Sequence, residues 1–379
     1  MDDFKAVMPG LASVVTVLFG AGCGMGADPE WPAVDAAITN VALDDCPEFG
    51  CGGDNSPLIN GTYFHELNMT STRARRIPIE GAALVDFTKT DEALKKPIHY
   101  TLHVEHGRIT GTKLFAPTLS GQDLVGAQLV VAIDGKEYAV RIEQVSTVGY
   151  WASTTGTPTP TIETYRLDYE LLESKTPAWQ DLCSNPPGHE SRDSMGGHEH
   201  DVVVFEGDRI DAATRTVTID SSGQWFNLGC AGGTLAKMAL TGHTIPAIDA
   251  GFVTTRAERQ TIVKLFSADY CGDGTAFTVA GQPLRWADDH ATMLFLPQGG
   301  FPTPATTLEA RWTEHGAACL GVPRAAVMNS PASAVFPDPG FSNVRSEIVA
   351  WCASVGHVIP DCADPTLGTD GYHLVSVNP

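Results

Sequence analysis

Apolar and polar residues alternate along much of the first half of the chain. Every second residue from Ile98 to Val104 is apolar, which is typical of a half-buried strand. The apolar runs Leu129–Ile133 and Tyr138–Val145 flank Asp134-Gly135, a dipeptide that suits the two-residue turn of a β-hairpin. The pattern from Ala82 to Tyr169 therefore predicts a succession of antiparallel strands.

Only a few segments of the second half have apolar residues at helical spacing. The sequence predicts short helices at Gly233–Leu240, Thr307–Ala318 and Ser346–Val355. It predicts a strand at Thr261–Phe266, which leads into the unusual stretch Ser267–Thr275. The expected fold is therefore a β-rich α+β protein with a few short helices, stapled by disulfides.

A segment rich in Gly and His at residues 181–200 interrupts the strand pattern. We expect two strand-rich lobes on either side of this loop, an N-terminal lobe at 46–180 and a C-terminal lobe at 201–379. Residues 24–45 are acidic and small and have no period, so we expect a flexible tether there.

Composition limits the partners of the chain. It has 379 residues and is 43% hydrophobic, which suffices for a sizeable core. It carries 24 Lys and Arg against 45 Asp and Glu, for a net charge of −21. Nucleic-acid binding requires clustered basic residues, and Arg73, Arg75 and Arg76 are too few to offset this charge. The acidic excess also disfavours attachment to an anionic bilayer through overall charge.

The N-terminus has the pattern of an export signal. Ala6–Gly22 form an apolar run of the length of a signal-peptide core. The run is followed by Cys23, and small residues before a cysteine resemble a bacterial lipobox. Residues 1–23 are therefore interpreted as a signal peptide in which Cys23 is lipidated.

Two features depart from this pattern, because Gly20 stands where Leu is usual and Lys5 is outnumbered by Asp2 and Asp3. Gly24 after the cysteine, in place of Asp, favours delivery to the outer membrane. We expect an exported protein that is anchored on the periplasmic or the surface face of the outer membrane, or else secreted.

Cysteine parity agrees with export. With Cys23 as the anchor, eight cysteines remain, an even number that permits four disulfides in an oxidising compartment. Short separations suggest the pairs Cys46–Cys51 and Cys352–Cys362. The other four are then expected to pair among themselves: Cys183, Cys230, Cys271 and Cys319. Zinc ligation by cysteine needs CxxC-type spacing, which the sequence lacks.

Histidines provide one candidate metal site. His189, His198 and His200 lie in the glycine-rich loop, and imidazoles two residues apart point the same way in an extended chain, as chelation requires. The alternative is a solvated loop, because ordering it around a metal would cost conformational entropy. The sequence predicts no cofactor.

The stretch Ser267–Thr275 is the most distinctive local sequence. Asp269 and Asp273 flank Cys271 and suggest an acid/base or calcium pair, but a calcium loop needs more converging oxygens than two side chains provide. Asp and Gly at this density suit a tight turn. We therefore expect a structural turn that is fixed by a disulfide at its centre.

Four blocks of sequence occur in order along the chain: Cys51–Pro57 with Phe64–Asn68, Phe205–Arg209 with Phe226–Gly232, Ala268–Gly274, and Glu309–Trp312 with Gly316–Cys319. Together they resemble the ADYC-domain family, named for the tetrapeptide at 268–271. These are secreted or lipid-anchored bacterial proteins. The resemblance places the domain at roughly 200–330 and extends through the upstream blocks to most of the chain. It implies export and paired cysteines, and it implies no catalytic residues.

The sequence thus favours an exported cell-envelope lipoprotein that acts as a binding or structural module. One alternative is a secreted hydrolase whose site lacks a recognisable motif such as G-x-S-x-G. Another is a metal-binding surface protein that uses the loop His189–His200. The expected partners are the membrane, through the lipid anchor, and an envelope or extracellular ligand.

Overall fold

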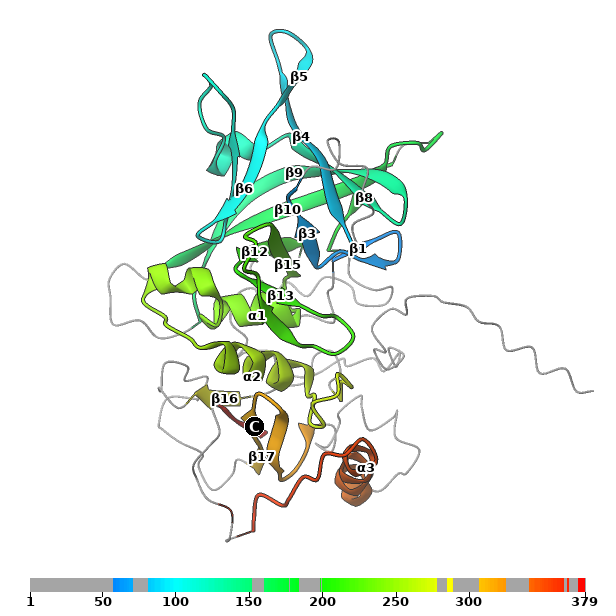
Figure 1. The fold of residues 1–379 in the computed structure, drawn as a ribbon, viewed down its shortest axis with the longest axis vertical. Helices are drawn as coiled ribbons and strands as arrows, with labels where there is room; N and C mark the ends of the chain where they lie inside the picture. Colours follow the sequence, from blue (N-terminus) through cyan, green and yellow to red (C-terminus); the bar gives the residue numbers. More distant parts are fainter. Residues whose placement is uncertain are drawn as a thin grey trace, which may run out of the picture.

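The computed structural model describes residues 57–70, 81–151, 160–176, 178–183, 198, 200–277, 285–288, 307–324, 341–364, 367 and 374–378. Over these ranges the protein has a β-rich α+β fold, as predicted, with one large sheet, several small sheets and three α-helices (Figure 1). No helix in the described part of the chain is long and apolar enough to cross a membrane.

The large sheet has nine strands: β3 (Glu66–Asn68), β4 (Ala83–Asp91), β5 (Lys96–His99), β8 (Ala127–Ile133), β9 (Lys136–Gly149), β10 (Thr161–Leu171), β11 (Gln180–Asp181), β12 (Asp201–Glu206) and β15 (Trp225–Cys230). Seven of them form a closed ring in the order β10-β12-β15-β3-β4-β8-β9, because β9 pairs with β10 again. The strands β5 and β11 lie outside this ring. The strands β12 and β15, from the predicted C-terminal lobe, thus complete a sheet whose other strands precede residue 182.

The predicted hairpin is confirmed by β8 and β9. Ile133 pairs with Lys136, and the turn residues Asp134 and Gly135 have φ values of 50° and 76°. Two positive φ values are those of a primed turn, whose twist matches that of the flanking strands. Alternate residues of β8 are buried, so one side of the hairpin faces the interior of the ring.

Smaller elements extend the ring. Three two-stranded sheets pair β1 (Leu58–Ile59) with β2 (Thr62–Tyr63), β6 (Thr101–Glu105) with β7 (Arg108–Thr112), and β13 (Asp208–Ile210) with β14 (Val217–Ile219). Two short 3₁₀ helices are η2 (Gly121–Leu124) and η4 (Ile245–Ala250).

The C-terminal third forms a second layer. Its four-stranded sheet runs β16-β19-β17-β18, with bounds Arg285–Asp288, Leu374–Asn378, Thr307–Thr313 and Gly316–Leu320. The helices α1 (Thr234–Leu240) and α2 (Arg256–Ser267) lie between the ring and this sheet, and α3 (Phe341–Ser354) lies beside it (Figure 1). One hydrophobic core fills the ring, and a second surrounds α1 and α2.

The helix α2 is the centre of this second core, and its start follows a capping box. Thr255 Oγ1 accepts the Glu258 N–H, and the Glu258 carboxylate accepts the Thr255 N–H. Every residue from Glu258 to Ser267 is buried. The predicted strand at Thr261–Phe266 is therefore wrong. Ile262, Val263 and Phe266 recur at the three- and four-residue spacing of a helix, but they stand in a short apolar run that is equally compatible with a buried strand.

Of the other three predicted helices, two are confirmed and one is wrong. Gly233–Leu240 is confirmed by α1, and Ser346–Val355 by the last turns of α3. The predicted helix at Thr307–Ala318 is wrong, because that segment forms β17 and the start of β18. Ala310 and Trp312 are both fully buried two residues apart, so the period there is that of a strand.

The described residues contain three disulfides: Cys183–Cys230, Cys271–Cys352 and Cys319–Cys362. The predicted Cys352–Cys362 pair is wrong, and so is the expectation that Cys271 and Cys319 pair within their own group of four. Cys352 lies on the buried face of α3, whereas Cys362 follows a bridge between Asp361 and Leu320 at the end of β18. Cys23, Cys46 and Cys51 lie outside the described residues. Three disulfides indicate an oxidising, extracytoplasmic location.

Candidate functional site

The two described histidines of the predicted metal loop face different carboxylates. His198 Nδ1 lies 2.7 Å from Asp201 Oδ2, an oxygen that also accepts a hydrogen bond from Thr164 Oγ1. His200 Nδ1 lies 2.7 Å from Asp181 Oδ2, an ion-pair distance without hydrogen-bond geometry. His189 lies outside the described residues. Within the described ranges, no three His, Cys, Asp or Glu side chains are grouped to hold a metal ion.

The stretch Ala268–Gly274, which we call the clasp, is a buried turn at the end of α2. Ala268 stops the helix in the left-handed conformation, with φ of 51°, and its N–H donates to the Leu265 carbonyl. Asp269 accepts the Gly274 N–H at 2.9 Å and pairs with Lys264 Nζ at 2.6 Å. The predicted turn and its central disulfide are confirmed, since Cys271 is bonded to Cys352.

Lys264 holds the clasp against a neighbouring loop. Its Nζ also donates to the Thr214 carbonyl at 2.9 Å and to the Gly272 carbonyl at 3.1 Å. Both side chains of the Lys264–Asp269 pair are almost fully buried, and burial raises the pKa of Asp269. A carboxylate that is enclosed and paired in this way stabilises the turn and is not presented to a ligand.

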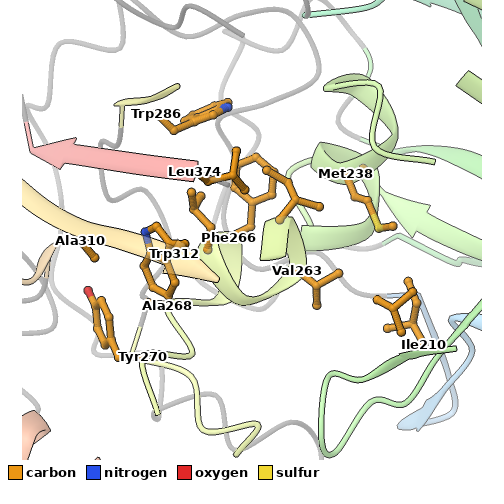
Figure 2. Close-up of a cluster of buried hydrophobic side chains, with 14 of the residues drawn as sticks. Ile210, Met238, Val263, Phe266, Ala268, Tyr270, Trp286, Ala310, Trp312 and Leu374 are labelled. Carbon is orange, nitrogen blue, oxygen red and sulfur yellow. The ribbon is translucent and has the colours of Figure 1, made fainter. Parts of the chain in front are cut away.

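Tyr270 connects the clasp to the second sheet. Its hydroxyl donates to Glu309 Oε1 at 2.5 Å, and its ring stacks on Trp312 with ring centres 5.2 Å apart. Figure 2 shows Tyr270 and Trp312 within the core that also holds Phe266. Glu309 pairs in turn with the buried Arg324 at 2.6 Å. Burial raises the pKa of Tyr270 well above its usual range, so this hydroxyl keeps its proton.

A more accessible set of ionisable groups lies where three turns meet. These are the β6–β7 turn at residues 106–107, the β12–β13 turn at 206–207, and η4 with the residues up to Val253. We call this region the junction surface. Glu206 Oε1 accepts the backbone N–H of His106 at 2.8 Å, and Oε2 accepts that of Gly107 at 3.2 Å. His106 Nδ1 pairs with Asp249, and both side chains are exposed.

Burial raises the pKa values of two groups beneath the junction surface. It raises the pKa of Glu206, against the lowering effect of the hydrogen bonds from His106 and Gly107. It raises the pKa of Tyr150 to about 12, and the charge of Asp249 adds to that effect. The Tyr150 ring packs on Phe252 at 5.1 Å, so η4 and the end of β9 are held together.

Apolar side chains are exposed beside these charges. Ile245, Ile248 and Val253 are all exposed large hydrophobic residues on or next to η4. The close approach of η4 depends on Gly207, because a Cβ there would lie 2.7 Å from Ile245 Cδ1. An exposed apolar group with a charged rim is typical of a binding surface for a partner that has both characters.

Sequence reasoning did not find the junction surface as a site. His106 and Glu206 are 100 residues apart, and His106 and Asp249 are 143 apart. The available local signal was Glu206-Gly207-Asp208, which indicates a turn and no chemistry.

Comparison with protein families gives one finding. A family model described as the ADYC domain matches residues 121–326, from η2 to just beyond Arg324. The match starts well before residue 200, where the sequence resemblance had placed the beginning of the domain, and it therefore includes ring strands from β8 to β15. Comparison with curated proteins and with solved structures gave no match.

Proposed function

The chain belongs to the ADYC domain family, and from the three disulfides among its described residues we propose that it is an exported cell-envelope lipoprotein that acts as a non-catalytic binding module. Disulfides form and persist in oxidising compartments, so these bonds are the observation on which the proposal depends. The anchor is the lipidated Cys23, in the outer membrane on either its periplasmic or its surface face. The ligand is a component of the envelope or its surroundings.

The junction surface is the proposed binding surface. Its exposed Ile248 and Val253 offer apolar contact, while His106 and Asp249 offer a hydrogen-bonding rim. The hydrogen bonds of Glu206 to His106 and Gly107, and the packing of Tyr150 on Phe252, hold its three turns together. A rigid surface loses less conformational entropy on binding than a mobile loop does.

The anchoring part is tested by replacing Cys23 with Ser. The wild-type chain is expected in the membrane fraction of the producing cell, with a mass increased by the lipid. The variant is expected in the soluble extracytoplasmic fraction or as an unprocessed precursor. A Cys23→Ser chain of the same mass shift and distribution as the wild type contradicts lipidation there.

The binding part is tested with a photo-crosslinking residue at Ile248, which is 57% exposed. Ile219 is a matched control, because it is also an aliphatic residue, is 59% exposed and lies on β14. A discrete adduct of constant mass is expected in intact cells at position 248 alone. Equal labelling at both positions, or none at 248, contradicts a binding role for the junction surface.

One observation favours a secreted hydrolase as the second candidate. The His106–Asp249 pair lies beside a carboxyl group, Glu206, whose pKa is raised by burial. Hydrolysis of an ester, peptide or glycoside by the purified protein, lost in both His106→Asn and Glu206→Gln variants that keep their thermal stability, would establish it. Activity that survives both substitutions would exclude this site.

A further inference from the structure

Two turns at one end of the molecule expose large hydrophobic side chains. They are the β4–β5 turn, residues 92–95, and the start of the loop from β7 to η2, residues 113–115; we call them the tip. Both lie at the same end of the long axis, at the top of Figure 1. Leu94 is 66% exposed, Leu114 is 78% exposed and Phe115 is 98% exposed.

Neither turn depends on its exposed apolar side chain for its conformation. Lys95 and Phe115 have φ values of 51° and 62°, in the left-handed region that glycine adopts at lower cost. Asp91 Oδ1 accepts the N–H groups of Ala93 and Leu94, at 2.9 and 2.8 Å, so the first turn is shaped by an aspartate and not by Leu94 packing. A bulky aromatic held in a strained, fully exposed position is typical of a functional contact.

The tip is also where lysine is concentrated. Four of the nine lysines of the chain lie on these two segments or next to them: Lys89, Lys95, Lys96 and Lys113. Lys89 Nζ donates to the Asp123 carbonyl at 2.6 Å and so joins β4 to η2, while the other three side chains are exposed. The four lysines outnumber the three acidic residues beside them, Asp91, Glu92 and Asp123, so this end is locally basic on a chain with a net charge of −21.

We propose that the tip docks onto a bilayer that contains anionic phospholipids. Leu94, Leu114 and Phe115 enter the boundary between headgroups and acyl chains, and the exposed lysines lie against lipid phosphates. Charge complementarity selects this occupant, since a lysine-flanked apolar projection fits an anionic interface. The acidic remainder of the molecule does not prevent it, because screening limits its field to about 8 Å at physiological salt.

This contact is independent of acylation at Cys23. It would add a second attachment and would orient the long axis of the molecule away from the membrane, because the tip lies at one end of that axis. The proposal therefore concerns which end of the protein faces a bilayer, whichever way the N-terminus is anchored.

A tryptophan introduced in place of Phe115 tests the contact directly. The full-length Phe115→Trp chain is mixed with vesicles of equal parts phosphatidylglycerol and phosphatidylcholine with brominated acyl chains. We expect the added tryptophan to be quenched, beyond the quenching of wild type. The matched Ile219→Trp chain, with its tryptophan on an exposed strand elsewhere, is expected to show no added quenching. If the Phe115→Trp chain binds vesicles but its introduced tryptophan is not quenched, the tip proposal is overturned and lipidation of Cys23 is unaffected.

Variants that remove lysine charge or apolar surface measure how much each contributes to vesicle binding. Each exposed lysine near an anionic surface contributes about a fivefold factor in binding, so the Lys95→Gln, Lys96→Gln and Lys113→Gln triple variant is expected to bind roughly a hundredfold more weakly. Phe115→Ser is expected to lose about tenfold or more. Lys136→Gln with Lys175→Gln, two exposed lysines outside the tip, is the control. An equal loss of vesicle affinity in the control, or an affinity that does not depend on the phosphatidylglycerol content, would overturn the proposal and favour a protein partner.

Discussion

Replacing Gly272 with Ala tests whether the clasp depends on backbone contact. Gly272 has φ of 74°, and a Cβ there would lie 2.0 Å from the carbonyl oxygen of His315. Gly135, in the β8–β9 turn, has φ of 76° and no atom within 4 Å of the same position. The two alanine variants therefore share the cost of a left-handed alanine, about 1–2 kcal/mol. Only the clasp variant must also move a neighbouring backbone.

The size of that second cost follows from what holds the backbone in place. Real Cβ atoms do not approach other atoms within 3.0 Å, so the clasp and the β17–β18 turn must separate by about 1 Å. The Ala317 N–H donates to the Tyr270 carbonyl at 2.9 Å, and Cys271 is bonded to Cys352, so neither side moves freely. Overpacking at such sites costs about 1–3 kcal/mol. We expect Gly272→Ala to lose about 2–5 kcal/mol in total, and Gly135→Ala about 1–2 kcal/mol.

The assay is urea unfolding of the oxidised proteins, followed by tryptophan fluorescence. Trp312 stacks on Tyr270 and reports on the clasp directly. The difference between the two variants is the quantity of interest, because the φ term cancels. Equal losses of stability in the two variants would refute the idea that close backbone contact, rather than backbone conformation alone, requires glycine at 272.

Three further outcomes are expected. Lys264→Met leaves Asp269 buried without its cation and is expected to cost about 3–5 kcal/mol in urea unfolding. The control Arg256→Met breaks a partly exposed pair with Glu314 and is expected to cost less than about 1 kcal/mol. Similar losses of stability in the two variants would contradict the burial argument. Removing the Cys271–Cys352 bond with serines opens a link across 81 residues and should lower the free energy of unfolding by about 4 kcal/mol, and an unchanged melting temperature under oxidising conditions would speak against it. Burial raises the pKa of Glu206 above its ordinary value of 4.5, so its contribution to stability is full below that value and is lost as the pH rises through the folded-state pKa. Glu206→Gln should therefore gain stability relative to wild type as the pH rises from 4 to neutrality. A difference in stability that stays constant with pH would exclude the raised pKa.

The elements that could be predicted were those whose conformation is set by residues adjacent in the sequence. The β8–β9 hairpin followed from Asp134-Gly135, and the turn of the clasp followed from its density of Asp and Gly. The helix α2 was missed because its apolar residues, Ile262 to Phe266, form a short run that cannot be distinguished from a buried strand by its pattern alone. The ring is set by long-range pairings such as β3 with β15, which leave no trace in local sequence.

The same limit applies to sites. The partners of the clasp, Lys264 and Glu309, are joined to it through the fold, and the sequence identified only the turn and the cysteine. The junction surface assembles His106, Glu206 and Asp249 from three distant turns. Spacing along the chain carries no information about such a group, whereas the β-rich class needed only composition and strand period.

The connectivity of the last two disulfides has a consequence for biogenesis. Cys271 pairs with Cys352 and Cys319 pairs with Cys362, so the two bonds interleave along the chain. A chain that crosses a membrane N-terminus first presents Cys319 to an oxidase before Cys352 has emerged. An oxidase that joins cysteines in order of arrival would link Cys271 to Cys319, and thiol–disulfide exchange would then have to undo that bond. Production of the native protein in quantity therefore calls for a disulfide isomerase as well as an oxidase.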